Sequence, residues 1–497
     1  MHINLLKHRY RLVFGYIGNL FVFFPIILLL PLIYCFWNPE LFLESLSFIV
    51  AAVISFLFGM LFKITMKVKP GSPITVQEGA IIVLFAWIFA IIFSAIPFIF
   101  GGYLNFTQAI FEATSGWTTT GLTLVDVSTI LKTYLIWRSI MQFLGGAGFA
   151  IIMMSAILGP AGLGLYRAEG RMDNLVPNIR SSTRVIAGIY SSYALAGVLM
   201  YRFAGMDWFD SINHSLTALA TGGFSTRLGS IGEFKSVTIE VITIVLMILG
   251  ATGFGIHYTI WKRNFKAFWK NGEPKLMFLT LAFFTPLIMA GTLSKFYESS
   301  GTQFRHGLFQ SVSAITGTGF STVDFVPWNH FGLYLITLLM IFGGCMDSTS
   351  GGLKQYRLFA LIKLLWMEIR MYFLPRDVVL KEEIWKGETK RYLDHIVVKE
   401  ILLVFGLYFL TFAIGVGVIS SYGHSLAFSA FEFASALSTV GLSTGITAPS
   451  APLGLLWAQT FGMFVGRLEF LVVIFAVTKL LRDGKLFLEI RRNNKRR

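Results

Sequence analysis

The sequence predicts an all-α polytopic membrane protein, and two observations carry this prediction. Hydrophobic residues make up 55% of the 497-residue chain and charged residues only 13%, whereas a soluble domain carries about 25% charged residues. Apolar runs long enough to cross about 30 Å of hydrocarbon recur along the whole chain. This composition cannot supply the polar surface of a soluble fold, so soluble, disordered and fibrous classes are excluded.

The apolar runs predict ten transmembrane spans. They fall at roughly 12–37, 41–62, 78–101, 133–158, 184–205, 236–261, 276–297, 331–372, 397–420 and 452–481. An even number of spans places both termini on the same side of the membrane. Lys and Arg cluster in alternate loops, and the positive-inside rule makes that side the cytoplasm. The same rule accounts for most of the net charge of +15, so nucleic-acid binding is not expected.

Four short segments between pairs of spans repeat one another column by column. Each has a hydroxyl residue six positions before an aligned glycine and Leu or Phe directly after it. The aligned glycines are Gly121, Gly223, Gly319 and Gly441. Their even spacing predicts an N-terminal two-helix extension at 1–72, repeat one at 73–160, repeat two at 161–265, repeat three at 266–375, and repeat four with a basic tail at 376–497.

Each repeated segment is too short to cross a bilayer, which predicts a re-entrant half-helix followed by an extended Thr/Gly-rich loop. Non-helical backbone at membrane depth is tolerated only where it is buried or lines a wet path. Four such loops, arranged with pseudo-fourfold symmetry around one pore, can replace the hydration shell of a cation with oxygen ligands. The expected ion-binding residues are Thr119, Thr120, Gly121, Thr221, Gly222, Gly223, Gly317, Thr318, Gly319, Thr439, Val440 and Gly441.

These segments resemble a known family. Thr439-Val440-Gly441-Leu442 resembles part of a potassium-channel filter, and the segments 221–226 and 319–322, with the four-repeat layout, resemble the Trk/Ktr/HKT superfamily of potassium transporters. The two extra N-terminal spans resemble its bacterial TrkH branch. The resemblance covers about 12–481.

The resemblance implies potassium uptake across the bacterial inner membrane, with potassium as the transported ligand and no cofactor in this chain. It implies a homodimer with one pore in each chain, controlled by a TrkA-like cytosolic nucleotide-binding subunit. Glycine at all four filter positions implies selectivity for potassium over sodium. The residues leave open whether flux is passive, as in a channel, or coupled to protons or sodium, as in a symporter.

A Gly- and Ser-rich stretch interrupts the predicted span 331–372. Glycine weakens a helix interior by about 1 kcal/mol per residue, so a continuous helix is not expected here. The stretch is either a kink for close helix packing or a mobile gate below the filter, and the resemblance implies the gate. The candidate gate residues are Gly343, Gly344, Cys345, Asp347, Ser348, Thr349, Gly351 and Gly352. Met346 and Asp347 depart from the small residues typical of the family.

Arg467 is predicted to lie in the middle of the last span. A charge at that depth costs at least ~2.5–3.5 kcal/mol on insertion scales. It either pairs with Glu469 or backbone carbonyls as a structural contact, or it lines the pore as a cationic barrier, which the resemblance implies. We also hypothesise that Asp347 pairs with Arg467 in the closed state.

Four acidic residues have weaker roles. Glu112 and Glu432 are expected to bond backbone amides behind the filter. Asp126 and Asp324 each follow a filter glycine by five residues and are either solvated loop residues or groups that attract cations to the outer mouth.

Two other classes of function compete with ion conduction. A secondary carrier for small organic solutes also uses broken helices, but such carriers commonly have inverted repeats rather than four parallel loop repeats. An enzyme is not expected, since the sequence has no catalytic Ser/His, paired-Asp or metal-ligand constellation.

Overall fold

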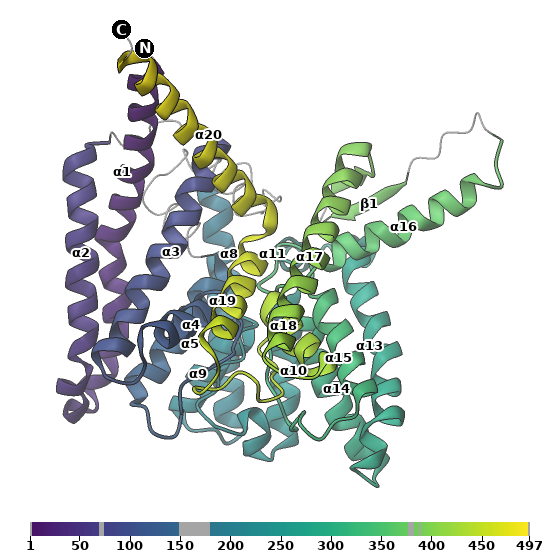
Figure 1. Ribbon diagram of the computed structural model, residues 1–497. Helices are drawn as coiled ribbons and strands as arrows, with labels where there is room; N and C mark the ends of the chain where they lie inside the picture. Colours follow the sequence, from purple (N-terminus) through teal and green to yellow (C-terminus); the bar gives the residue numbers. More distant parts are fainter. Residues whose placement is uncertain (1, 69–73, 149–178, 376–381, 387–388, 496–497) are drawn as a thin grey trace.

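Helices dominate the computed structural model, which describes residues 2–68, 74–148, 179–375, 382–386 and 389–495 (Figure 1). One departure from the all-α prediction is a two-stranded antiparallel sheet in which β1 (Glu383–Lys386) pairs with β2 (Thr389–Tyr392). The predicted boundaries after residues 72 and 160 lie outside the described residues, as does the predicted end of the span 133–158.

The N-terminal extension is a helical hairpin. Its helices are α1 (His2–Leu29), which continues into the 3-10 helix η1 (Leu30–Phe36), and α2 (Leu46–Met66), joined by the short turns η2 (Pro39–Leu41) and η3 (Leu43–Ser45). The two helices pack closely because Gly59 of α2 lies directly against the backbone of Phe21 and Val22. A larger side chain at residue 59 would separate them.

Each repeat begins with a long helix followed by a short one. The long helices are α3 (Val76–Phe100), α8 (Ile179–Phe203), α13 (Gly272–Gly291, extended by η6, Leu293–Lys295) and α17 (His395–Ser421). The short helices are α4 (Phe106–Trp117), α9 (Trp208–Leu219), α14 (Ser300–Thr316) and α18 (Leu426–Leu437). Side-chain caps from Asn105, Asp207 and Ser425 start three of the short helices by accepting a backbone N–H of the first turn.

After each short helix and its Thr/Gly-rich segment, the repeat continues with another helix. These helices are α5 (Lys132–Ala147), α10 (Val237–Ala251), α15 (His330–Phe342) and α19 (Leu453–Leu468). After them come α11 (Phe254–Trp261) and α12 (Phe265–Lys270) in repeat two, α16 (Gln355–Met371) in repeat three and α20 (Phe470–Lys495) in repeat four. The predicted break in the span 331–372 is therefore present, between α15 and α16.

Two predicted spans are not continuous helices. The span 236–261 bends by 103° between α10 and α11, and the span 452–481 bends by 101° between α19 and α20. Thr252 and Gly253 leave the helix with extended backbone. Glu469 takes a left-handed conformation with φ +58°, which a side-chain-bearing residue seldom adopts and which a sequence pattern does not reveal.

Within the described residues, five helices are long and apolar enough to cross a membrane, or seven if each bent pair counts as one span. The ten crossings that the sequence predicts stay a prediction. α1 begins and α20 ends at the same end of the molecule, at the top of Figure 1. A hydrogen bond of 3.1 Å from the Tyr10 hydroxyl to Asp483 ties the two helices together there.

Part of the glycine content serves helix packing at one recurring place. In three repeats, a glycine of the helix that follows the short helix (α5, α10 or α19) lies against the carbonyl oxygen of the last residue of that short helix. These contacts join Gly145 to Trp117, Gly250 to Leu219 and Gly466 to Leu437. A Cβ at any of these glycines would overlap that oxygen, so the short helices can end close to the centre of the molecule.

Candidate functional site

The four Thr/Gly-rich segments meet in a closed ring. A Cβ atom placed on an aligned glycine would overlap a carbonyl oxygen of the next repeat. Gly121 faces Gly222, Gly223 faces Thr318, Gly319 faces Val440, and Gly441 faces Thr120 of the first repeat. The carbonyl oxygens before the four glycines therefore lie between adjacent segments, where no side chain can enter.

The backbone of each segment alternates in handedness. The aligned glycines have φ between +74° and +95°, and the residues two positions before them have φ between +50° and +69°. Three of those earlier residues are Thr119, Thr221 and Thr439, for which a positive φ is a strained conformation that costs of order 1–3 kcal/mol. Alternating handedness turns successive carbonyl groups toward one side, whereas an ordinary strand directs them to opposite sides.

Two threonine hydroxyls of the ring are buried polar groups without a hydrogen-bond partner in the described part of the chain. They belong to Thr119 and Thr439, and both residues are fully buried. An unsatisfied buried hydroxyl costs about 1–3 kcal/mol. Its oxygen is a suitable ligand for a hard cation. The equivalent Thr221 instead donates to the Ala220 carbonyl at 2.7 Å.

The ring offers oxygen ligands without a carboxylate cluster. Among the described residues, no three His, Cys, Asp or Glu side chains come close enough to hold a metal ion. The C-terminal ends of the short helices, which carry partial negative charge, lie next to the ring. Neutral oxygens and helix dipoles favour a monovalent cation over Ca²⁺ or Mg²⁺.

A side-chain brace recurs behind the ring in every repeat. The residue nine positions before the glycine bonds the hydroxyl of the residue two positions after it. The four bonds are Glu112 to Thr123 at 2.9 Å, His214 to Ser225 at 2.9 Å, Gln310 to Ser321 at 3.3 Å and Glu432 to Ser443 at 2.7 Å. The expected amide bonding is confirmed, because Glu112 accepts from Leu124 N at 2.9 Å and Glu432 from Thr444 N at 3.0 Å.

The interruption between α15 and α16 forms a loop packed directly beneath the ring. Gly351 lies against the Ser438 carbonyl and the Thr439 hydroxyl. Thr349 accepts a hydrogen bond of 3.1 Å from the Thr221 hydroxyl and donates one of 2.8 Å to the Gly250 carbonyl. The loop therefore contacts segments of repeats two and four at once.

Further bonds fix the shape of this loop and its neighbours. Cys345 N donates to Ala251 O at 2.9 Å, and the Asp347 carbonyl accepts from Phe254 N at 3.1 Å. These two contacts fall where α10 breaks. Inside the loop, Ser348 donates to Cys345 O at 2.6 Å, and Gly344 N donates to the Ser350 hydroxyl at 3.0 Å. Gly343 and Gly352 both have positive φ and pack on each other.

Arg467 reaches the same loop from the last turn of α19. Its guanidinium donates to the carbonyls of Gly145 at 2.7 Å and Gly146 at 3.1 Å, and to the carbonyl of Thr349 in the loop. Carbonyls in the last turn of a helix stabilise a positive charge. The carboxylate of Glu469 is bound by Arg357 at 2.5 Å. Arg467 thus joins α5 to the loop, and its pairing with Asp347 stays a prediction.

Comparison with known proteins places the chain in a family. The family described as TrkH, cation transport protein, matches residues 45–489. The chain belongs to the TrkH cation transport family. One relative is the Trk system potassium uptake protein TrkG of Escherichia coli K12, at 32% identity over 82% of this chain and 85% of that one. Another is an uncharacterized cation transporter of Methanocaldococcus jannaschii, at 28% identity over 92% and 93%.

A solved structure shows the same fold. The crystal structure of the potassium transporter TrkH from Vibrio parahaemolyticus superposes with a TM-score of 0.78 at 26% identity, over 94% of this chain and 98% of that one. TrkH-family membership and the apolar helices make the chain a multi-pass membrane transporter of cations and not an enzyme. The alternative of a carrier for organic solutes is therefore set aside.

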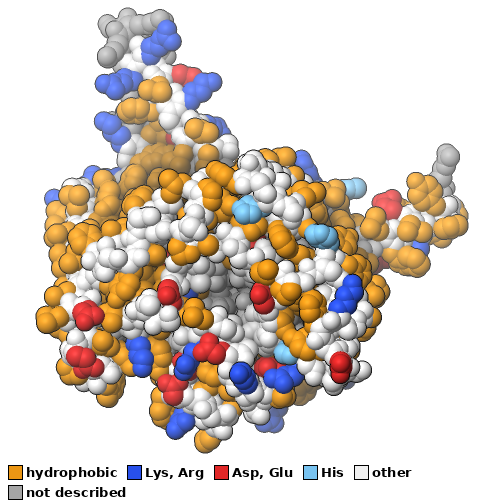
Figure 2. All heavy atoms as spheres, turned by 60° about the horizontal axis from the view of Figure 1, so that its bottom comes forward, with side chains coloured by type: hydrophobic (Ala, Val, Ile, Leu, Met, Phe, Trp, Pro, Cys, Tyr) orange, Lys and Arg blue, Asp and Glu red, His pale blue; other side chains and the backbone are white. Residues whose placement is uncertain are grey.

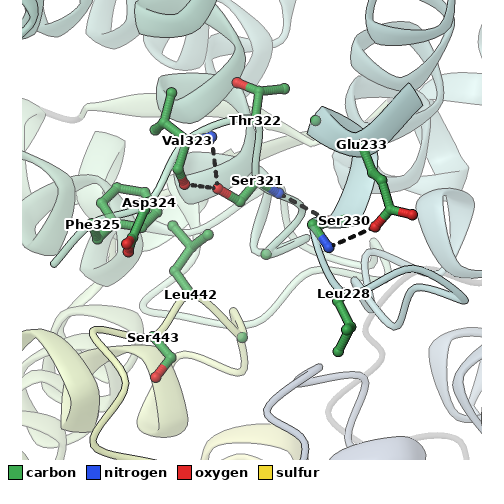
Figure 3. A pocket seen from close by; sticks show the side chains of 14 residues that line it. Leu228, Ser230, Glu233, Ser321, Thr322, Val323, Asp324, Phe325, Leu442 and Ser443 are labelled. Carbon is green, nitrogen blue, oxygen red and sulfur yellow. Dashed lines mark hydrogen bonds between the residues drawn. The ribbon is translucent and has the colours of Figure 1, made fainter. Parts of the chain in front are cut away.

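In this TrkH-family chain, the ring opens toward the face at the bottom of Figure 1. That face is hollowed at its centre, with acidic side chains around the hollow (Figure 2). A cavity of about 480 Å³ there is lined by Gly319, Gly441 and the side chains of Glu233 and Asp324 (Figure 3). Glu233 belongs to η5 (Ser230–Phe234). These carboxylates lie where an arriving cation would meet the ring.

Asp126, in the loop after Gly121, is exposed and is not among the residues that line this cavity. Hydrogen bonds of 2.6 and 2.9 Å from the Ser128 hydroxyl and amide hold the pKa of its carboxyl below the ordinary value. Its negative charge is therefore retained in mildly acidic solution, but, unlike Asp324, Asp126 does not line the cavity.

Sequence reasoning missed two polar residues that touch the ring from α5. Arg138 and Gln142 are both buried and contact the segments of repeats one and two. The available signal was their position inside the apolar run 133–158, where a polar or ionisable side chain predicts a functional contact.

Proposed function

We propose that this chain is the ion-conducting subunit of a Trk-type potassium uptake system in the bacterial inner membrane. The observation that carries the proposal is the closed ring of four glycine segments, with two buried threonine hydroxyls that lack partners among the described residues. Relatives with about a third of their residues identical bear the name potassium uptake protein, which supports potassium as the cation.

In this proposal, four helix–loop–helix repeats surround one pore, within ten crossings that leave both termini in the cytoplasm. Potassium enters at the cavity lined by Glu233 and Asp324, loses its water at the ring, and passes between the carbonyl oxygens. The predicted ion-binding residues at 119–121, 221–223, 317–319 and 439–441 are its ligands. Glycine at all four aligned positions supports preference for potassium over sodium.

The loop 343–352 closes the pore in this proposal. Its position directly beneath the ring, against Thr439 and Thr221, supports the role of a gate. Arg467 places a positive charge at the same depth and holds the loop through the Thr349 carbonyl. Opening then requires that the loop move away and that Arg467 leave the ion path.

A regulatory partner fits this arrangement. We propose that a TrkA-like cytosolic nucleotide-binding subunit moves the gate, and that two chains form a homodimer with one pore each. The names of the relatives place them in a Trk system, which supports a multi-component assembly. Helix α16 projects from the molecule and begins directly after the loop 343–352 (Figure 1). A cytosolic partner that binds α16 can therefore move this loop.

Thermal unfolding of the purified chain tests ion binding without requiring an open gate. A ligand that binds only the folded state raises the melting temperature. Potassium and rubidium chloride are expected to raise it more than sodium or choline chloride at equal ionic strength. An equal melting temperature in all four salts would contradict the proposal.

A further inference from the structure

Helix α5 presents two polar side chains to the back of the ring, one turn apart. Arg138 and Gln142 are 1% and 0% exposed. Both belong to repeat one, yet both reach the segment of repeat two. A helix buries such groups only when their hydrogen bonds are made, since an unpaired buried polar group is costly.

Gln142 fills a space that a side chain fills in the other repeats. Its amide nitrogen donates to the Gly222 carbonyl oxygen, and its amide oxygen accepts from Phe224 N at 3.1 Å. A Cβ atom on Gly222 would overlap the Gln142 amide group. The residue in the same column is Thr120, Thr318 or Val440 in the other repeats, so only repeat two has glycine there.

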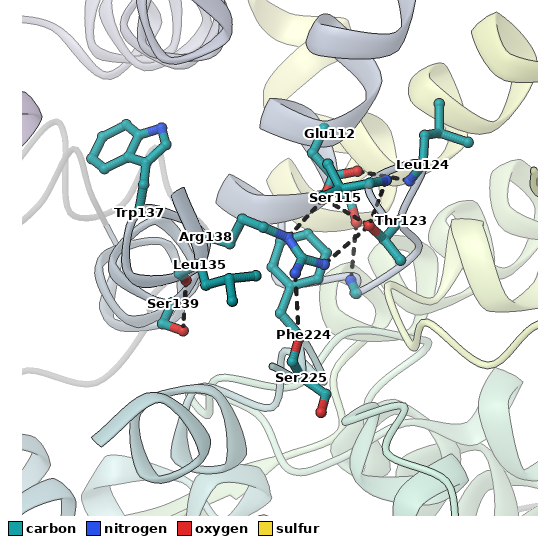
Figure 4. A network of polar contacts seen from close by, with 12 residues as sticks. Glu112, Ser115, Thr123, Leu124, Leu135, Trp137, Arg138, Ser139, Phe224 and Ser225 are labelled. Carbon is teal, nitrogen blue, oxygen red and sulfur yellow. Dashed lines mark hydrogen bonds and ion pairs between the residues drawn. The ribbon is translucent and has the colours of Figure 1, made fainter. Parts of the chain in front are cut away.

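Arg138 ties the segments of repeats one and two together. Its guanidinium donates to Glu112 at 2.9 Å, to the Thr123 hydroxyl at 3.0 Å and to the Ser225 carbonyl at 3.3 Å (Figure 4). It also stacks over the ring of Phe224, 4.0 Å from its centroid. On both sides of this junction, the bonded residues lie two positions after the aligned glycines, Thr123 after Gly121 and Ser225 after Gly223.

We propose that Gln142 determines ion selectivity by holding the repeat-two segment from behind, with Arg138 as a second positioning residue at the same junction. This rests on the proposed function of the ring as a potassium filter. The Gly222 carbonyl is one of the four oxygens between adjacent segments, and Gln142 fixes its position with a donated N–H. Without that bond, the Gly222 carbonyl loses this donor. The glycine pair at 222 and 223 has no side chain, and the 2.9 Å bond from Gly222 N to the Thr217 carbonyl does not fix the position of the carbonyl oxygen.

The test compares reconstituted wild-type chain with Gln142→Met, which keeps the length of the side chain and removes both hydrogen bonds. The readout is the ratio of potassium to sodium flux in proteoliposomes. A fall of at least about fivefold is expected, since the loss of the bond to the Gly222 carbonyl alone has the effect of one typical hydrogen bond on an equilibrium. Ile136→Val, on the same helix at a half-buried position, is the matched control and should leave the ratio unchanged.

A compensating pair tests the filled space directly. Gln142→Ala leaves a void and Gly222→Thr meets the Gln142 amide, so each alone should lower the ratio. The double variant Gln142→Ala/Gly222→Thr recreates the column of repeats one and three and should recover most of it. A double variant no better than either single variant would overturn the proposal.

The failure of this inference is distinguishable from failure of the proposed function. A wild-type chain that does not discriminate potassium from sodium refutes the filter itself. A selective wild-type chain with an equally selective Gln142→Met variant refutes only the role of Gln142. Melting temperatures of all variants separate a change in selectivity from a loss of fold.

Discussion

Gly121 lies against the carbonyl oxygen of Gly222, across the junction between repeats one and two, with a backbone φ of +93°. Gly423 has the same φ of +93°, but a Cβ there would meet no atom within 4 Å. The two glycines therefore share the same positive φ and differ in their surroundings. This pair separates the conformational need for glycine from the need for empty space at the ring.

Gly121→Ser is expected to raise sodium flux relative to potassium flux, because its Cβ overlaps the Gly222 carbonyl and displaces an ion ligand. Gly423→Ser places a side chain at the same positive φ and should leave the flux ratio unchanged. Both ratios are measured in proteoliposomes. An unchanged ratio in Gly121→Ser would remove this residue from the filter.

Arg467→Ala is expected to raise basal potassium flux by about tenfold or more, since each 1.4 kcal/mol of lost repulsion or lost loop anchoring changes a population tenfold. Flux without a regulatory partner is the measurement. Arg482→Ala, at an exposed position of α20, is the control for loss of a positive charge. Unchanged or lower flux in a folded Arg467→Ala protein would count against the barrier.

Glu112→Gln should destabilise the fold more than Glu432→Gln does. Both carboxylates accept backbone amides behind the ring, but only Glu112 also neutralises a buried arginine, Arg138, at 2.9 Å. Removing a partner from a buried ion pair costs about 3–5 kcal/mol, against about 1–3 kcal/mol for an unsatisfied buried group. Melting temperatures in detergent give the order.

The same ion pair provides an internal check. Glu112→Gln/Arg138→Met removes the uncompensated charge, so it should recover part of the stability lost in Glu112→Gln. If the two glutamate variants melt alike, Arg138 does not depend on Glu112.

Gly351→Ala is expected to raise basal flux, because its methyl group would overlap the Ser438 carbonyl and the Thr439 hydroxyl and so prevent the loop from packing under the ring. Gly188→Ala in α8, where no atom lies within 4 Å of the added methyl, should behave as wild type. The idea fails if stopped-flow or tracer flux shows Gly351→Ala to be as closed as Gly188→Ala.

The repeated columns allowed much of the site to be predicted. Hydroxyl, apolar and glycine positions at fixed offsets identified the four short helices and the segments that follow them. For Glu112 and Glu432, bonding to backbone amides was predicted. The hydroxyl brace that they share with His214 and Gln310 was not predicted, because these four side chains share the contact but not the charge. The interruption of the helix at 343–352 followed from the low helix propensity of glycine. The packing of this loop against repeats two and four did not.

Other features depend on contacts that a single sequence does not show. The bends after Ala251 and Leu468 lie in apolar runs that read as continuous helix, and the break at Glu469 requires a left-handed residue. The carbonyl partners of Arg467 come from α5 and the loop, which lie more than a hundred residues away. The β1–β2 hairpin lies in a polar stretch without a strand pattern.

Cation flux through proteoliposomes containing the chain tests the central claim most directly. Wild-type chain and the Arg467→Ala variant are both reconstituted, so that a closed gate does not hide conduction, and uptake of K⁺, Rb⁺, Na⁺ and Li⁺ is compared with that of empty vesicles. We expect K⁺ and Rb⁺ to permeate well above Na⁺ and Li⁺ in both proteins, with larger absolute flux in the variant. Equal permeation by all four cations, or none above empty vesicles in either protein, would contradict a potassium-selective ring.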